Sequence, residues 1–171
     1  MARRTLKKSR VRDRTDATYR YYALKAAVQG ISTETDLDMG LQLLLGLAVD
    51  ALEQGGAVAA FRGPEGGAFI GKVSAGKPPV LPATVQVVPG EAYNSLVAGR
   101  PYVVRKPEFA PNAGITGVPV RGVVAVVPAI FRGEVLAAMV LWQKGTASVS
   151  DHVLEHVGLL AQVAGLLIAN E

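Results

Sequence analysis

Residues 123–142 read VVAVVPAIFRGEVLAAMVLW, and this stretch decides the fold of the chain. Two aliphatic runs flank the short polar break Phe131-Arg-Gly-Glu134. Each run is short for a helix and the break has turn chemistry, so the stretch predicts a hairpin of two central β-strands. Strands that are apolar on both faces must be covered by helices or loops. We therefore expect the core of the domain to lie here.

The composition indicates one soluble globular domain with an extension. The chain has 171 residues, of which 50% are hydrophobic and 19% are charged. It has no cysteine, which excludes disulfides, thiolate metal sites, thiol nucleophiles and thioether-linked chromophores. The apolar run 157–169 is too short to span a bilayer, and the basic N-terminus is not followed by the apolar segment of a secretory signal. We expect a cytoplasmic protein that does not engage a membrane.

The positive charge is concentrated in residues 1–14, which hold seven basic residues against Asp13, while the whole chain is only +4. The basic residues of this arm are Arg3, Arg4, Lys7, Lys8, Arg10, Arg12 and Arg14. The segment has no apolar period, so we expect a flexible arm, or one ordered by a partner, ahead of a single domain over 15–171. Three roles stay open: contact with nucleic-acid phosphates, aided by stacking of the nearby tyrosines, docking on an acidic protein surface, or simple solvation. No sequence specificity follows from a cationic arm.

The remaining chain alternates helical and extended patterns. We expect helices over 15–30 and 35–54, the second opened by a capping box at Thr35 and stopped by Gly55-Gly56. The expected strands are 57–61, 68–74, 101–105 and the two arms of the opening hairpin, with a short helix over 91–98 and a final helix over 150–170. Residues 106–122 predict a long loop, which is a candidate wall of a binding site.

The final helix has two apolar stripes. Val153, Val157, Leu160, Ala164 and Leu167 form the first, which we expect to face the sheet. A second stripe on this helix, and another on the 35–54 helix, predict a helical interface, either within the chain or between two copies in a symmetric dimer, which is the interpretation we favour. The expected interface residues are Leu43, Leu47, His156, Leu159, Val163 and Leu166.

Over residues 22–170 the chain resembles a GAF domain. The segment 31–38 running into Leu41–Leu45 is similar to the entry of the first long GAF helix. Residues 90–104 resemble the family's short helix followed by a G-R-P-x-V-V strand. Val124–Ile130 and Arg132–Leu136 resemble its central strand with an embedded proline and the following hairpin. The order and spacing of these segments carry the resemblance.

The resemblance implies an α+β fold, in which terminal helices pack on one face of an antiparallel sheet and a short helix with loops covers a ligand pocket on the other. It also implies a sensory or regulatory module that dimerises through its terminal helices. Without cysteine the chain cannot attach a bilin covalently or act as a reductase of free methionine sulfoxide that uses cysteines. No clear cyclic-nucleotide pattern is present, and the cofactor stays unknown. Because no output domain follows in this sequence, we expect a separate effector partner or a role for the arm.

The polar residues around the expected pocket are the candidate ligand-binding set. They are Tyr93, Asn94, Ser95, Arg100, Tyr102, Arg105, Asn112, Thr116 and Arg121. The three arginines would converge on an anionic ligand, because guanidinium groups suit carboxylate and phosphate. The alternative is that they solvate loops and edge strands.

Two further patterns are interpreted as structural. His152 and His156 have the i, i+4 spacing of two metal ligands, but no third ligand stands nearby, so no metal site is expected. Residues 64–67 are glycine-rich without a following Gly-Lys-Ser/Thr, which indicates a hairpin turn and not a phosphate loop. No catalytic pair can be assembled from these residues. We therefore predict a non-enzymatic homodimeric GAF-type regulatory module; the alternative is a nucleic-acid-associated protein that binds through the arm and dimerises through the core.

Overall fold

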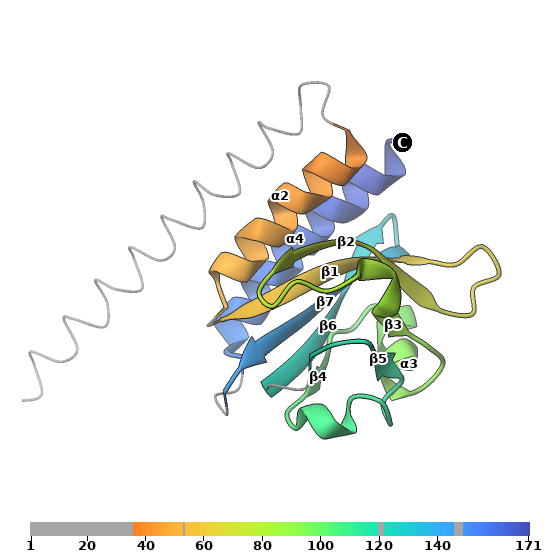
Figure 1. Cartoon of the computed structure of the whole chain (residues 1–171). Coiled ribbons are helices and arrows are strands. Elements are labelled where there is room, and N and C mark those ends of the chain that lie inside the picture. The colour runs from red at the N-terminus through yellow and green to blue at the C-terminus, as the bar shows by residue number, and fades with distance from the viewer. Residues whose placement is uncertain (1–35, 53, 120–121, 146–148) are drawn as a thin grey trace, which may run out of the picture.

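The structure is a computed structural model that describes residues 36–52, 54–119, 122–145 and 149–171. Seven strands form one antiparallel sheet in the order β4-β6-β7-β1-β2-β3-β5 (Figure 1). The strands are β1 (Gly55–Arg62), β2 (Phe69–Gly76), β3 (Gln86–Val87), β4 (Tyr102–Val104), β5 (Ile115–Thr116), β6 (Gly122–Phe131) and β7 (Glu134–Lys144). The helices are α2 (Leu37–Asp50), α3 (Glu91–Val97) and α4 (Asp151–Ala169), with short 3-10 turns η1 (Pro82–Thr84) and η2 (Pro107–Phe109).

The predicted hairpin is confirmed as β6 and β7, which are adjacent interior strands of the sheet. Phe131 pairs with Glu134 across a two-residue turn of Arg132 and Gly133. Both turn residues have positive φ, 49° and 82°, which matches the twist of the flanking strands. Every residue from 123 to 129 in β6 is buried, as expected for a strand that is covered on both faces.

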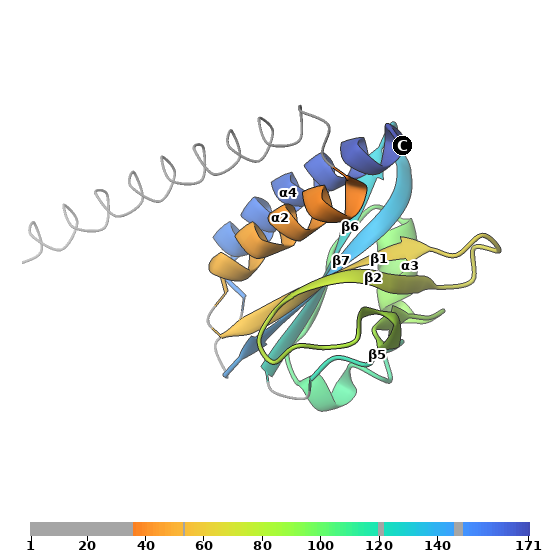
Figure 2. The same cartoon turned by 45° about the horizontal axis from the view of Figure 1, so that its top comes forward.

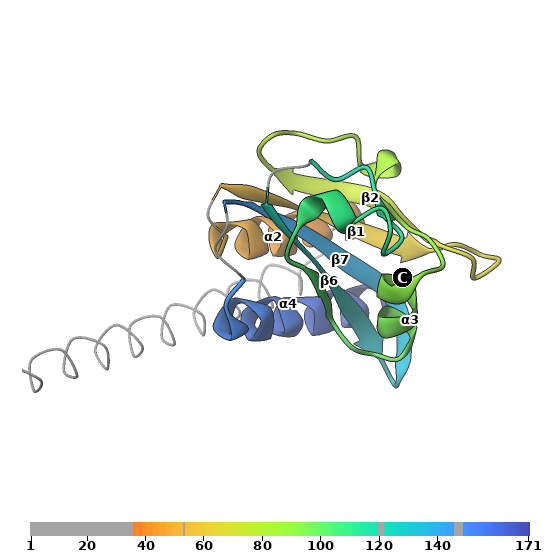
Figure 3. The ribbon, with the colours of Figure 1, turned by 90° about the horizontal axis from the view of Figure 1, so that it is seen from below.

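The helices α2 and α4 pack side by side on one face of the sheet, and α3, η2 and the long connections cover the other (Figures 2 and 3). Alternate residues of β6 and β7 therefore belong to two separate cores. The helix-side core takes Ala125, Val127, Ala129, Ala137, Met139 and Leu141 from these strands. The α3-side core takes Val124, Val126, Val135, Ala138, Val140 and Trp142.

Helix α4 begins as predicted. The Ser150 hydroxyl caps it by accepting a hydrogen bond from the Val153 backbone N–H at 3.3 Å. Val157, Leu160 and Ala164 of the predicted sheet-facing stripe are buried, with Val153 and Leu167 packed at the edge of the same core. The helix is long and apolar enough to meet a membrane-span criterion, with a mean hydropathy of 1.5, but core helices of soluble proteins meet it too. Its packing against β6 and β7 accounts for the apolar residues on its sheet-facing side.

Helix α2 differs from the prediction at its C-terminal end. It ends at Asp50, and Gly55 and Gly56 lie inside β1 and do not terminate the helix. The physical reason is the close approach of β7: a Cβ on Gly55 would meet the Trp142 carbonyl oxygen, and one on Gly56 would meet the Trp142 ring. The helix expected over 15–30, the basic arm and Thr35 lie outside the described residues.

Candidate functional site

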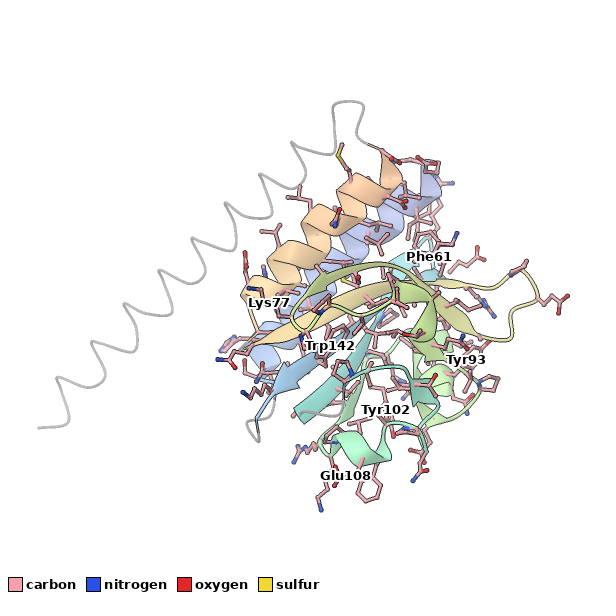
Figure 4. All side chains as sticks on the ribbon, viewed as in Figure 1. Phe61, Lys77, Tyr93, Tyr102, Glu108 and Trp142 are labelled. Carbon is pink, nitrogen blue, oxygen red and sulfur yellow. The ribbon has the colours of Figure 1, made fainter. Side chains whose placement is uncertain are left out.

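The face of the sheet under α3 is where the polar candidate residues gather. Helix α3 buries Ala92 and Leu96 against β6 and β7, which directs its polar side chains outward. Figure 4 shows Tyr93, Tyr102 and Trp142 on this side of the sheet. The geometry of each candidate determines whether it is available to a ligand.

Tyr93 links α3 to the turn between β1 and β2. Its hydroxyl donates a hydrogen bond to the Gly66 carbonyl oxygen. The centroids of the Tyr93 and Phe69 rings lie 5.7 Å apart and the ring planes are tilted by 55°, within the usual range for a packed aromatic pair. Tyr93 thus connects two segments of the fold, and its hydroxyl is already used.

Tyr102 and Glu91 form a second link, between β4 and the first turn of α3. The Tyr102 hydroxyl donates to Glu91 Oε2 at 2.5 Å. This hydrogen bond raises the pKa of Tyr102 above its ordinary value of 10.0, and slight burial and the negative charge of Glu91 act in the same direction. The phenol is therefore held neutral and oriented toward α3.

The other candidates lie on the rim of this face. The Ser95 hydroxyl donates to the carbonyl oxygens of Arg100 and Pro101, at 3.1 and 3.2 Å, and so closes the turn after α3. The side chains of Asn94, Arg100, Arg105, Asn112 and Thr116 are exposed, and Arg121 lies outside the described residues. Among described residues the structure buries no arginine or lysine, so it does not bring the arginines together inside an anion pocket.

Beneath this rim the α3-side core is apolar. Residues of β1, β6 and β7 form its floor. Strand β2, the short strands and the connections add Phe69, Val85, Val87, Ala110, Ala113 and Ile115. Tyr93, Tyr102, Val80, Val118 and Ile130 pack around its margin. The interior therefore offers a ligand mostly apolar contacts.

Trp142 was interpreted from sequence as a packing residue, and the structure adds a polar feature. The side chain is only 2% exposed and belongs to the α3-side core. Its indole Nε1 is buried and has no hydrogen-bond partner among the described residues. Pairing of Trp142 with Gly56 was not visible in the sequence, because it depends on the register of β7 against β1.

No metal centre is formed in the described part of the chain, where no group of three His, Asp or Glu side chains lies close enough to hold an ion. His152 is exposed, whereas His156 is 7% exposed and lies within the helical layer. The residues 64–67 form the turn between β1 and β2, as predicted, with Gly63 N donating to Ala68 O at 2.8 Å.

The predicted interface residues divide into two groups. Leu43, Leu159 and Leu166 are 45%, 47% and 48% exposed on the outer side of α2 and α4. Leu47 and Val163 are partly buried against the helix-side core, and His156 is buried within the chain and is not part of the exposed set. Met39, which belongs to the same predicted stripe of α2 as Leu43 and Leu47, is 60% exposed.

Comparison with solved structures identifies the fold as GAF-like. The GAF domain of a phosphoenolpyruvate-protein phosphotransferase from Coxiella burnetii superposes with a TM-score of 0.74 and 15% identity, over 90% of this chain and 95% of that one. The corresponding domain from Acinetobacter gives a TM-score of 0.73 and 16% identity, over 88% and 92%. Free methionine-R-sulfoxide reductase from Neisseria meningitidis, in complex with its substrate, gives 0.72 and 15%, over 90% of both chains.

At the sequence level, no family model and no curated protein matches this chain. The fold is thus a GAF-like α+β domain, as the sequence resemblance implied. Identities of this size establish the architecture alone.

Proposed function

We propose that this protein is a non-enzymatic, homodimeric GAF-type sensory or regulatory module. A small ligand bound under α3 alters the helical layer on the opposite face, and that layer passes the change to a separate effector protein. The GAF domains among the similar structures support a regulatory role in general. The absence of cysteine separates the chain from thiol-based chemistry.

The observation that carries this proposal is the sharing of β6 and β7 by the two cores. Val126 and Val140 pack on the α3 side, while their neighbours Val127 and Met139 pack on the helix side. Because interiors are close-packed, a displacement of these strands by a ligand is transmitted directly to α4. Coupling between two such sites is typically about 1–3 kcal/mol.

The exposed leucines support a dimer. Leu43, Leu159 and Leu166 are exposed on two helices that pack side by side, and exposed apolar side chains gathered on one layer suit an interface. A second copy of the chain would cover it in a symmetric manner. The exposed Arg100 and Arg105 would supply guanidinium groups for an anionic part of the proposed ligand.

Native mass spectrometry of the freshly purified full chain tests the ligand. We expect a retained small molecule whose removal and return shift the NMR signals of α4. A protein that carries no such molecule, and whose α4 signals respond to no added metabolite, would exclude ligand sensing and leave only a scaffold role.

Light scattering tests the dimer through Leu159→Asp and Leu166→Asp. Both are expected to give monomers. The matched control is Leu81→Asp, because Leu81 is 75% exposed and lies outside the helical layer. A dimeric mass that persists in both helix variants would exclude this interface.

The basic arm supports a second candidate function, association with nucleic acid. Seven cationic side chains in residues 1–14 would release counterions from a phosphate backbone, which gives steeply salt-dependent binding. The full chain would then bind a mixed-sequence duplex at low salt, and a chain lacking residues 1–14 would not. Equal binding by both chains, or none by either, would eliminate this function.

A further inference from the structure

The indole N–H of Trp142 is a buried hydrogen-bond donor without an acceptor. The side chain is 2% exposed, and Nε1 has no partner among the described residues. Buried polar groups in folded proteins are nearly always satisfied, and an exception calls for a specific cause such as a bound molecule. The indole nitrogen can only donate, so whatever satisfies it must supply an acceptor.

The position of this indole is built into the sheet. Trp142 pairs with Gly56 of β1 and Val124 of β6. The indole atoms Cε2 and Cζ2 occupy the space that a Cβ on Gly56 would fill. The ring edge next to the nitrogen therefore rests directly on the β1 backbone, which fixes the donor in one place.

The surroundings of the donor determine which molecules suit it. The buried members of the core that holds the indole are apolar, among them Val58, Val124 and Val140. Val80, from the β2–β3 connection, and Val118, after β5, pack at the margin of the same core and are only partly buried. No cationic side chain is buried in the described part of the chain, so a carboxylate or phosphate here would lose its hydration without compensation.

We infer that the α3-side core beside Trp142 binds a neutral, mostly apolar small molecule that carries one hydrogen-bond acceptor, such as a carbonyl oxygen, and that the indole N–H donates to it. The inference rests on the proposed ligand-sensing function and specifies the ligand class of that site. The apolar part of the ligand replaces contacts of the partly buried Val80 and Val118 with the sheet. The acceptor of the ligand receives the hydrogen bond of the Trp142 indole N–H. Charged groups of a ligand, if any, stay at the rim.

The test uses Trp142 as its own reporter, since it is the only tryptophan in the chain. A ¹H–¹⁵N spectrum of the full-length protein contains one indole signal. Three probes of similar size separate the possibilities: acetophenone has a neutral acceptor, ethylbenzene has none, and benzoate carries a charge. Acetophenone is expected to move the indole signal downfield and to bind about 10-fold more tightly than ethylbenzene or benzoate, as one net hydrogen bond and an uncompensated carboxylate predict.

The variant Trp142→Phe keeps an aromatic ring but removes the donor together with the five-membered ring, so ethylbenzene is the control for the change in volume. Relative to ethylbenzene, acetophenone is expected to lose about 2- to 12-fold in affinity. The indole shift in the unaltered protein is read independently of whether the variant folds. Equal affinity for acetophenone and ethylbenzene, tightest binding of benzoate, or no saturable binding of any probe would overturn the inference; in the last case an indole cross-peak to water would show that water alone satisfies the donor.

These outcomes are separate from failure of the proposed function. A charged ligand that is retained by the purified protein and leaves the indole signal unmoved would overturn the ligand class and leave the sensory role intact. Acetophenone binding that never changes the α4 resonances would support the site and count against its coupling to the helical layer.

Discussion

The packing of α4 on β6 makes a sharp prediction at two glycines of the same helix. Gly165 faces the sheet, and a Cβ built on it would lie 2.7 Å from the Ile130 carbonyl oxygen, with the Ile130 C and N atoms at 3.0 and 3.1 Å. Gly158, two turns earlier, has no atom within 4 Å of its would-be Cβ. We therefore expect Gly165→Ala to destabilise the protein and Gly158→Ala to stabilise it.

The magnitudes follow from two opposing effects. Alanine in a helix interior is favoured over glycine by about 1 kcal/mol, which both variants gain. At Gly165 the atoms in the way are backbone, so α4 and β6 must move apart from 2.7 Å toward an ordinary contact of 3.4 Å. A gap of this order forfeits a quarter to a half of each contact it opens, and overpacking costs about 1–3 kcal/mol. The overpacking cost less the helix-propensity gain leaves a net loss of up to about 2 kcal/mol for Gly165→Ala, against a gain of about 1 kcal/mol for Gly158→Ala.

Thermal and urea unfolding of the full chain measure both variants. For a chain of this length, roughly 2–4 °C of melting temperature corresponds to 1 kcal/mol, so Gly165→Ala should melt up to about 8 °C lower and Gly158→Ala about 2–4 °C higher. Midpoints at equal protein concentration keep any dimer contribution constant. Equal stabilisation by both substitutions would show that α4 does not approach β6 as closely as the structure has it.

Three further predictions address the caps and contacts around the site. Glu91→Gln should lower the pKa of Tyr102 toward 10.0. In the unaltered protein, the stabilisation from the Tyr102–Glu91 pair should be present below pH 10.0 and disappear as the pH rises through the raised pKa of folded Tyr102. Phenolate absorbance, with Tyr102→Phe as the blank, measures the pKa, and an unmoved pKa in Glu91→Gln would contradict the contact. Gly56→Ala should cost about 1–3 kcal/mol and shift Trp142 fluorescence to longer wavelength, because the new Cβ displaces the buried indole; unchanged emission and stability would refute that packing. Ser150→Ala should cost about 1 kcal/mol in urea unfolding by removing the N-cap of α4, whereas Ser150→Asp should retain it.

The two links formed by Tyr93 and Tyr102 bear on how a ligand would enter. They join α3 to the β1–β2 turn and to β4, and so hold the cover of the α3-side core in place. The Tyr93 hydroxyl bonds to Gly66 and the Tyr102 hydroxyl bonds to Glu91, so the two hydroxyls do not point to one shared ligand position. Tyr93 and Tyr102 thus stabilise the cover, whereas the interior beneath it is apolar.

The sequence by itself determined the architecture. Local periodicity was sufficient for the β6–β7 hairpin, the sheet-facing stripe of α4 and its Ser150 cap, because each depends on residues within a few turns or one reversal of the chain. The GAF-like fold followed from the order of such segments. The tertiary structure decided the rest: that Gly56 lies under Trp142 and does not end α2, that His156 is buried, and that the exposed arginines do not enter the interior.

The physical reason is register. Which residue of β1 lies opposite Trp142 depends on pairing across strands far apart in the chain, and a slip of one residue would place every side chain on the other face. Polarity alone placed Tyr102 in a pocket, but only the fold shows that Glu91 takes up its hydroxyl. The unpartnered indole N–H arises from that same register, and it is the feature of this protein that depends most completely on tertiary structure.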